Sequence, residues 1–515
     1  MKIISNLLVK LSTYSLYALL LLSSSCNNLD LKPLNAILVE NFFITENDFR
    51  GATLASYSSM QNLYATTEEN LLAANEWWKL TIMTEDNMSA EVDSDLLEYS
   101  KFRFLPDDNA FAFTYIIVYQ GIHRANVVLE KLQEGKDELS EAEKKQYEAE
   151  AKFLRAWFHF QSFKLWGGNA PLMEKTLTDF DNLVAGNSTP EATISLILSD
   201  LQFAADNLPD AWDSSNTGRA TSWTAKAYLG KVNLYNHNLD AAQVFFKDVY
   251  ENGPYGLMSD YASVFSYDHE NNQESIFEIQ FAGNSDDNGW VLDDFHSENF
   301  KATQGYNRGS DQDIESGANY RPAEEYAAIG DANDPRYAAN IYSEGDTYYD
   351  GYGDSFVIED MSEYSDTGHL LKKYRGENIA LMGASNEVVD YNNERIFRFA
   401  DLILMYAETL VGSDPALATQ LINQVRLRSF PAATPVADGL SPVDLSTALR
   451  FERRLELAFE GHRYFDLVRW GIAQETFDAL DPENLWASKT ANGLFPIPQT
   501  EIDRSGGVLT QIPGL

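Results

Sequence analysis

Residues 147–168 read YEAEAKFLRAWFHFQSFKLWGG and give the first indication of the fold. Apolar side chains recur along this stretch every three or four positions: Tyr147, Ala151, Leu154 and Phe158. That spacing predicts a helix with one apolar face. A second apolar stripe runs beside the first, so we expect burial over a wide arc. Gly167 and Gly168, followed by Pro171, predict where the helix ends.

The same periodicity recurs in other parts of the chain. Residues 396–410, 415–425 and 448–465 each carry a helical apolar stripe. Further helices are expected near three segments: 108–132, 190–207 and 221–236. Helices joined by short turns favour an array of helix pairs, in which each pair buries its apolar face on its neighbours. The chain carries no clean 34-residue repeat consensus that would name the repeat type from periodicity alone.

A central stretch differs from these helical segments. Residues from about 252 to 390 are rich in Gly, Asn, Asp and Tyr and contain turn clusters such as 283–289 and 345–351. We therefore expect a loop-rich insertion in an α-rich scaffold. Binding residues are often carried by loops that a rigid scaffold positions.

The N-terminus predicts an exported lipoprotein. Lys2 and Lys10 precede a mainly apolar run, Leu16 to Leu22, that ends in three serines and Cys26. A membrane span needs about 20 apolar residues, so this short run is typical of a cleaved signal peptide, residues 1–25. Cys26 is the single cysteine of the chain, which favours acylation over disulfide or metal chemistry. Ser23 stands where such signals usually have Leu, and the alternative is an ordinary cleaved signal.

Composition excludes several classes of function. The 515 residues are 44% hydrophobic and 13% aromatic, enough for a large core, and the formal net charge is −40. A negative field of this size repels phosphate backbones, so we expect no nucleic-acid partner. It also excludes docking on anionic lipid through a basic patch, so any membrane attachment must depend on the acyl chains of Cys26.

No motif predicts an enzyme. The sequence has no His-Glu-x-x-His, no Gly-x-Ser-x-Gly and no phosphate-binding Gly-rich loop before Lys-Ser/Thr. Its 7 histidines are scattered singly, so we expect neither a metal site nor a cofactor. The sequence Glu460-Gly461-His462-Arg463 looks like an acid–base group, but His462 lies in an apolar stripe and is expected to be a buried core residue.

Several segments, in order, resemble the SusD/RagB family of outer-membrane nutrient-binding lipoproteins. They include Phe42 to Asp48, Glu150 to Pro171, Gly218 to Lys231, Arg398 to Glu408, and Arg453 to Trp470. The resemblance extends over nearly the whole chain. It implies one α-rich SusD-like domain, residues 26–515, with four tetratricopeptide-type helix pairs packed against a loop-rich ligand-binding face.

The resemblance also implies a function and partners. It implies an outer-membrane protein, lipid-anchored at Cys26 and facing outside, that binds oligosaccharides and delivers them to a SusC-like TonB-dependent transporter. The alternatives are a RagB-like protein that captures peptides, a glycoside hydrolase, and a helical scaffold for protein assembly.

The candidate ligand-binding residues combine aromatic rings with polar side chains in predicted loops. A pyranose stacks on an aromatic ring, while amides, carboxylates and guanidinium groups bond its hydroxyls. The residues that fit this chemistry are Trp77, Trp78, Asp86, Asn87, Trp290, Phe295, Tyr306, Arg308 and Tyr320. The alternative for each ring is that it packs beneath its loop.

Overall fold

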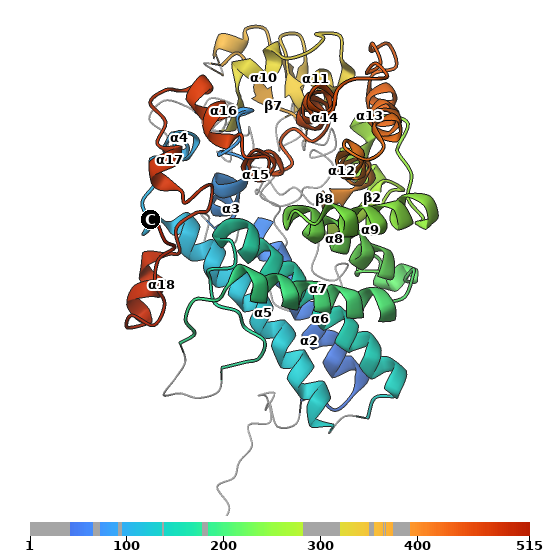
Figure 1. The fold of residues 1–515 in the computed structure, drawn as a ribbon, viewed down its shortest axis with the longest axis vertical. Coiled ribbons are helices and arrows are strands. Elements are labelled where there is room, and N and C mark those ends of the chain that lie inside the picture. The colour runs from blue at the N-terminus through green and yellow to red at the C-terminus, as the bar shows by residue number, and fades with distance from the viewer. Residues whose placement is uncertain are drawn as a thin grey trace, which may run out of the picture.

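The structure is a computed structural model that describes residues 42–64, 73–90, 95–135, 138–177, 184–281, 320–349, 355–363, 365, 367–373 and 392–515. Long helices build one end of the molecule, and short strands and helices build the other (Figure 1). The long helices at the N-terminal end are α2 (Glu46–Tyr64), α5 (Asn109–Glu134), α6 (Glu141–Trp166) and α7 (Pro190–Asn207).

Helix α6 contains the stretch quoted above and behaves as its sequence predicts. Ser140 and Glu143 form a capping box at its N-terminus, and Gly167 adopts a left-handed φ of 63° at its C-terminus. The helix is buried over most of its circumference because α2, α5 and α7 all pack on it. Two of its buried charges are paired with residues outside the helix: Arg155 binds Asp200 of α7 through two bonds of 2.7 and 2.9 Å, and Glu150 binds Arg219.

The array continues through α8 (Ser222–Tyr235), α9 (Leu239–Asn252), α12 (Phe399–Leu410), α13 (Pro415–Ser429) and α14 (Pro442–Glu456). Each of these helices packs on the next in that order, although almost 150 residues separate α9 from α12. The close approach of α5 to α6 depends on glycine. At Gly121 of α5, a Cβ would lie 2.2 Å from the Phe158 ring of α6.

Within 252–390 the described elements are short, as the composition predicts. They are β2 (Ser275–Ile279), β3 (Tyr320–Pro322), α10 (Glu324–Ala328), α11 (Pro335–Asn340), β4 (Ile341–Tyr342), β5 (Thr347–Tyr349), β6 (Ser355–Val357) and β7 (Leu370–Leu371). Two more strands complete the antiparallel pairs: β1 (Met88–Ala90) with β3, and β8 (Glu394–Arg398) with β2. The other pairs are β4 with β7 and β5 with β6.

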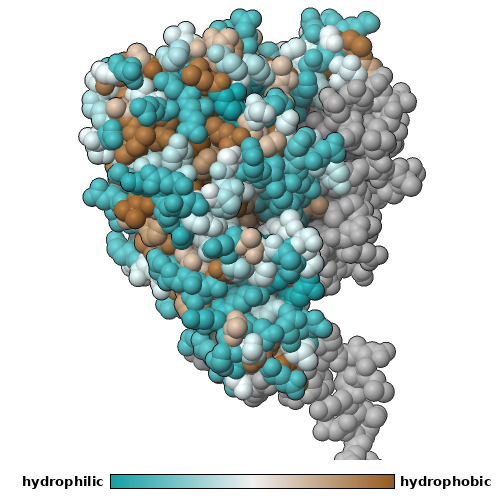
Figure 2. All heavy atoms as spheres, turned by 90° about the vertical axis from the view of Figure 1, so that its right-hand side faces the viewer, coloured by the Kyte–Doolittle hydropathy of each residue, from teal (hydrophilic) through white to brown (hydrophobic). Residues whose placement is uncertain are grey.

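The remaining short helices cover the side of the molecule near the C-terminus (Figure 1). They are α3 (Ala73–Thr81), α4 (Asp95–Ser100), α15 (Arg463–Arg469), α16 (Ala473–Leu480), α17 (Trp486–Lys489) and α18 (Gln499–Arg504). On the face seen in Figure 2, apolar groups gather over the upper part and hydrophilic residues cover most of the rest. No helix in the described part of the chain has the length and apolarity of a membrane span.

Candidate functional site

A cavity lies where the helical array meets strand β8. Its enclosed volume is about 30 Å³, and the wider space of about 500 Å³ between its walls includes open solvent. Aromatic rings and charged groups from distant parts of the chain line it: Tyr64, Trp77, Trp78, Trp157, Phe160, Gln161, Lys164, Tyr228, Lys231, Glu394, Glu460 and His462. We call this space the central cavity.

Lys164 of α6 is the unusual residue of the central cavity. Its ammonium lies 4.5 Å from the ring centroid of Phe465 and 5.8 Å from those of Trp77 and Phe160. In the described structure it makes no hydrogen bond or ion pair. Burial, together with the Lys231 ammonium, lowers the pKa of Lys164 to about 7. The cavity therefore presents an ammonium whose three donors are available to an acceptor.

The second lysine of the cavity is neutralised. Lys231 lies 2.9 Å from Asp401, whose other oxygen lies 2.8 Å from Arg453. His462 is buried, as predicted, with Nε2 3.8 Å from Asp401 and no hydrogen bond to it. Burial and the Lys231 ammonium lower the pKa of His462 to about 3, so the ring is neutral at pH 7.

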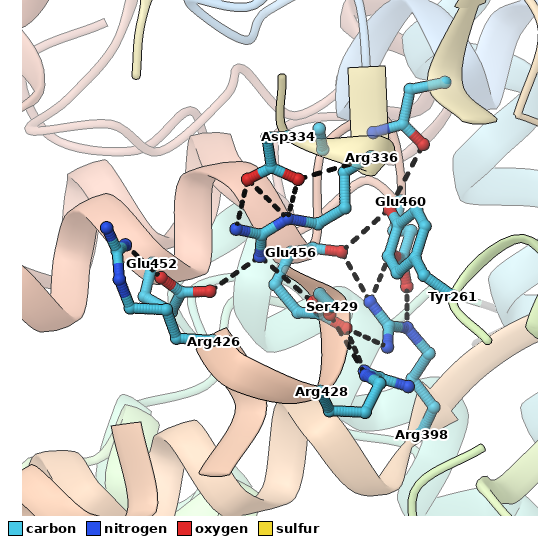
Figure 3. Close-up of polar contacts among 12 residues, drawn as sticks. Tyr261, Asp334, Arg336, Arg398, Arg426, Arg428, Ser429, Glu452, Glu456 and Glu460 are labelled. Atoms are coloured by element: carbon cyan, nitrogen blue, oxygen red, sulfur yellow. Dashed lines mark hydrogen bonds and ion pairs between the residues drawn. The ribbon is translucent and has the colours of Figure 1, made fainter. Parts of the chain in front are cut away.

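The Glu460 wall of the cavity belongs to a large buried ion-pair network (Figure 3). Glu460 lies 2.6 Å from Lys373 and 2.7 Å from Arg398. Glu456 in turn contacts Arg398 and Arg428 at 2.8 and 2.6 Å. The network ties α13, α14 and the end of β8 together, and it holds Glu460 in place with its charge compensated. The expectation that residues 460–463 serve packing and ion pairing fits these contacts.

Trp77 and Trp78 border the cavity, but their rings are buried, with 3% and 2% of their surface exposed. Tyr64 contacts both rings edge-on, with centroids 5.9 and 6.4 Å away. This is the packed arrangement that the sequence left open as the alternative. In this conformation neither ring has a face open to solvent.

Asp86 and Asn87 are also buried, at 3% and 0% exposure. Arg463 donates two hydrogen bonds to the Asp86 carboxylate, at 2.7 and 2.9 Å, and Arg454 donates one to the Asn87 side-chain oxygen at 2.7 Å. Burial opposes ionisation of Asp86, but Arg463 outweighs it and lowers the pKa. These contacts fix the turn that leads into β1.

Four predicted ligand residues, Trp290, Phe295, Tyr306 and Arg308, lie outside the described residues. For Tyr320 the structure gives only the backbone, where it opens β3 and faces Ala90 of β1. The structure therefore brings Trp77 and Trp78 together at the cavity and places Asp86 and Asn87 in the adjoining turn.

Three undescribed segments each have one flanking residue close to the cavity. Tyr64 precedes residues 65–72 and lines the cavity. Phe281 precedes residues 282–319, and its N–H donates at 2.7 Å to the side chain of Asn393, which lies just after residues 374–391 and next to the cavity residue Glu394. Gln61 of α2 donates to the carbonyl of Gln280 at 2.7 Å. These hydrogen bonds hold the flanking residues near one another.

Lys164 was not predicted from the sequence. The sequence did contain one sign that this lysine is buried. It stands between Phe163 and Leu165, near the end of a helix that has apolar residues on most of its circumference. Lysine is rarely buried without a partner, so that pattern could have marked it for inspection.

Two family profiles match most of the chain. The SusD family profile matches residues 258–514. A second profile, described as starch-binding associating with outer membrane, matches residues 46–234. The matches together include the long helices, the cavity wall and the ion-pair network.

Individual relatives agree with the profiles. A SusD-like protein of Formosa agariphila is 27% identical, over 96% of this chain and 97% of its own. The solved structure of a laminarin binding SusD-like protein is 28% identical, with a TM-score of 0.74 over 92% of this chain and 100% of the other. A SusD superfamily protein from Bacteroides vulgatus, 23% identical, has the same fold, with a TM-score of 0.76 and the same coverage.

The predicted α-rich, SusD-like fold is confirmed by these structural matches. Together with the two profiles, they establish the relationship that the sequence motifs suggested. This chain belongs to the SusD/RagB family.

Proposed function

We propose that this protein is a non-catalytic outer-membrane protein that binds oligosaccharides. The observation that carries the proposal is the aromatic central cavity, beside which one flanking residue of each of three segments lies. The candidate ligand residues Trp290, Tyr306 and Arg308 follow one of these flanking residues, Phe281, in the sequence. A rigid helical array that carries ligand loops at one place is a common plan for binding proteins.

A neutral glucan is the ligand class that we propose. The relative described as laminarin binding is 28% identical over nearly the whole length of both chains. The net charge of −40 disfavours polyanionic glycans. Capture without hydrolysis fits the Glu460 carboxylate of the cavity wall, since Lys373 and Arg398 hold it as a compensated ion rather than a proton donor.

We further propose that Cys26 is acylated and anchors the protein at the cell surface, and that a SusC-like TonB-dependent transporter receives the ligand. The signal-like N-terminus and the family support this. Metabolic labelling with a fatty acid should mark the wild-type protein and leave Cys26→Ala unlabelled. Recovery of a labelled Cys26→Ala protein would contradict the assignment of the anchor.

The test of ligand binding is affinity electrophoresis of residues 27–515 in gels that contain laminarin, other soluble glucans, a sulfated polysaccharide or no glycan. We expect retardation by a neutral glucan with no release of reducing ends. Trp290→Ala should lose at least half of the retardation, and Trp223→Ala, a half-buried tryptophan of α8, serves as the matched control. Failure of every glycan to retard the protein would contradict carbohydrate capture and favour peptides.

A further inference from the structure

A second groove lies away from the central cavity, between the connection from α7 to α8, the turn after α9, and strand β2. These elements lie together on the right of Figure 1. The groove has a volume of about 240 Å³. Its lining includes Asp210, Trp212, Thr217, Arg219, Tyr255, Asn271, Ser275 and Ile276, and none of these residues lines the central cavity. We call it the lateral groove.

Trp212 is held rigidly at one side of the lateral groove. Its indole N–H donates to the carbonyl of Ala220 at 2.8 Å. The Arg219 guanidinium lies 4.3 Å from the ring centroid, and that guanidinium is itself bound to the fully buried Glu150. The ring is half-buried and fixed by both contacts, so a ligand that stacks on it would immobilise little additional side-chain freedom.

Tyr255 contributes a second ring to the groove lining. Its ring lies against Phe399, with centroids 6.2 Å apart and planes at 34°. The ring is half-buried in the groove wall, like that of Trp212. Two fixed, partly exposed rings beside one concave space offer flat apolar surfaces on which a ligand can stack.

The polar groups of the groove are acceptors rather than free cations. Asp210 is exposed, and its Oδ1 accepts from Ser222, while none of the described residues forms a hydrogen bond with Oδ2. Thr217 and Ser275 donate their hydroxyl protons to Ser214 and Glu278, which leaves their oxygens able to accept. The vicinal hydroxyls of a sugar can donate hydrogen bonds to these oxygens.

The charge of the groove selects among glycans. Arg219 is committed to Glu150, and Asp210 and Asp213 stand exposed on the connection beside it. An acidic sugar would meet these carboxylates without a free cation to balance them.

We propose that the lateral groove is a second carbohydrate-binding site, which takes a neutral pyranose unit stacked on Trp212. The proposal rests on the proposed function for its ligand class but uses none of the same residues. On a polymer, two sites on one molecule raise the apparent affinity, because binding at one site holds the chain near the other.

The test combines isothermal titration with oxidative footprinting of the protein that comprises residues 27–515. Neutral oligosaccharides of several linkages serve as ligands, laminarin oligosaccharides included. We expect the glycan to protect Trp212 from oxidation, and we expect Trp212→Leu to weaken binding at one site about tenfold. Trp223→Leu is the control, because Trp223 also lies under a cation, Lys226 at 4.1 Å, but does not line the groove.

The outcomes separate the two proposals. A glycan that binds with the same affinity to Trp212→Leu and to the wild type, and leaves Trp212 unprotected, overturns the lateral groove and leaves the main site standing. Binding that survives Trp290→Ala but is weakened by Trp212→Leu supports the groove alone. If no neutral glycan binds, both proposals fail. Tyr255→Leu gives a second variant of the groove should Trp212→Leu prove unstable in a thermal melt.

Discussion

At the scale of single residues, the protein has both buried charges that ion pairs compensate and Lys164, for which the described structure has no ion pair. Glu456 is fully buried and meets Arg336, Arg398 and Arg428. Burial alone would raise its pKa, but the three arginines lower it to about 2. Lys164 is the opposite case, because aromatic rings surround it and no carboxylate of the described residues forms an ion pair with it.

We expect Glu456→Gln to cost about 3–5 kcal/mol of unfolding free energy, since it leaves buried guanidinium groups without their counter-ion. The folded-state pKa lies below the ordinary value of 4.5, so the contribution of the carboxylate is complete above pH 4.5 and is lost as pH falls toward 2. Urea unfolding at pH 7 and pH 3 measures both effects. Glu483→Gln, at an exposed position, should change neither, and an equal loss in both variants would refute the role of the network.

We expect Lys164→Met to stabilise the protein by about 1 kcal/mol at pH 6, because it removes a desolvated ammonium and keeps the side-chain volume. The folded-state pKa is near 7, against the usual 10.5, so the unfolded chain binds more protons between these values. The unfolding free energy of the wild type should therefore rise between pH 7 and pH 10, as the folded protein loses the proton of Lys164. The difference in unfolding free energy between the variant and the wild type should shrink over the same range. Urea unfolding from pH 6 to pH 10 measures this difference in unfolding free energy, and Lys247→Met, at an exposed position, is the control. If Lys164→Met is instead less stable than the wild type, the ammonium has a partner.

At the scale of elements, the distance between α5 and α6 depends on Gly121. A Cβ at this position would lie 2.2 to 2.5 Å from the Phe158 ring, whereas a Cβ at Gly51 of α2 would meet nothing within 4 Å. Both glycines lie inside helices, so the pair separates the effect of packing from the effect of helix propensity.

We expect Gly121→Ala to lower the unfolding free energy by about 1–3 kcal/mol through overpacking. Gly51→Ala should instead raise it by about 0.5–1 kcal/mol, because alanine loses less backbone entropy in a helix. Thermal or urea unfolding of the two variants checks the opposite signs. Equal changes in both would mean that the two helices can separate without cost.

The elements also show what the sequence can and cannot predict. The spacing of apolar residues predicted α6 and its end at Gly167, because helix periodicity and caps are local. The sequence predicts Asp86 and Asn87 as ligand-binding residues of a loop, yet both are buried, and Arg463 and Arg454, nearly 400 residues away, bond to their side-chain oxygens. Local sequence carries no sign of such a partner. The same limit applies to Trp78, whose burial depends on what folds over it.

At the scale of the whole molecule, the net charge of −40 dominates the electrostatics. Self-repulsion of this kind destabilises the compact state and is screened by salt. We expect the melting temperature to rise by a few degrees between about 10 and 300 mM NaCl. Differential scanning calorimetry measures the melting temperature, and a choline chloride series checks whether the identity of the cation matters. A melting temperature that falls with salt would show that the buried ion pairs, rather than the surface charge, control the salt response.

The framework fixes the residues that flank 282–319, and this has a consequence for evolution and for engineering. On one side Phe281 is bonded to Asn393. On the other side β3 is paired with β1, and the N–H of Ala323, just after β3, donates to the carbonyl of Asn87. Both attachment points belong to the framework and not to the segment itself. Recombination between genes could therefore replace the segment as a cassette, and a library of such chimaeras on one framework would sample new specificities without a new fold.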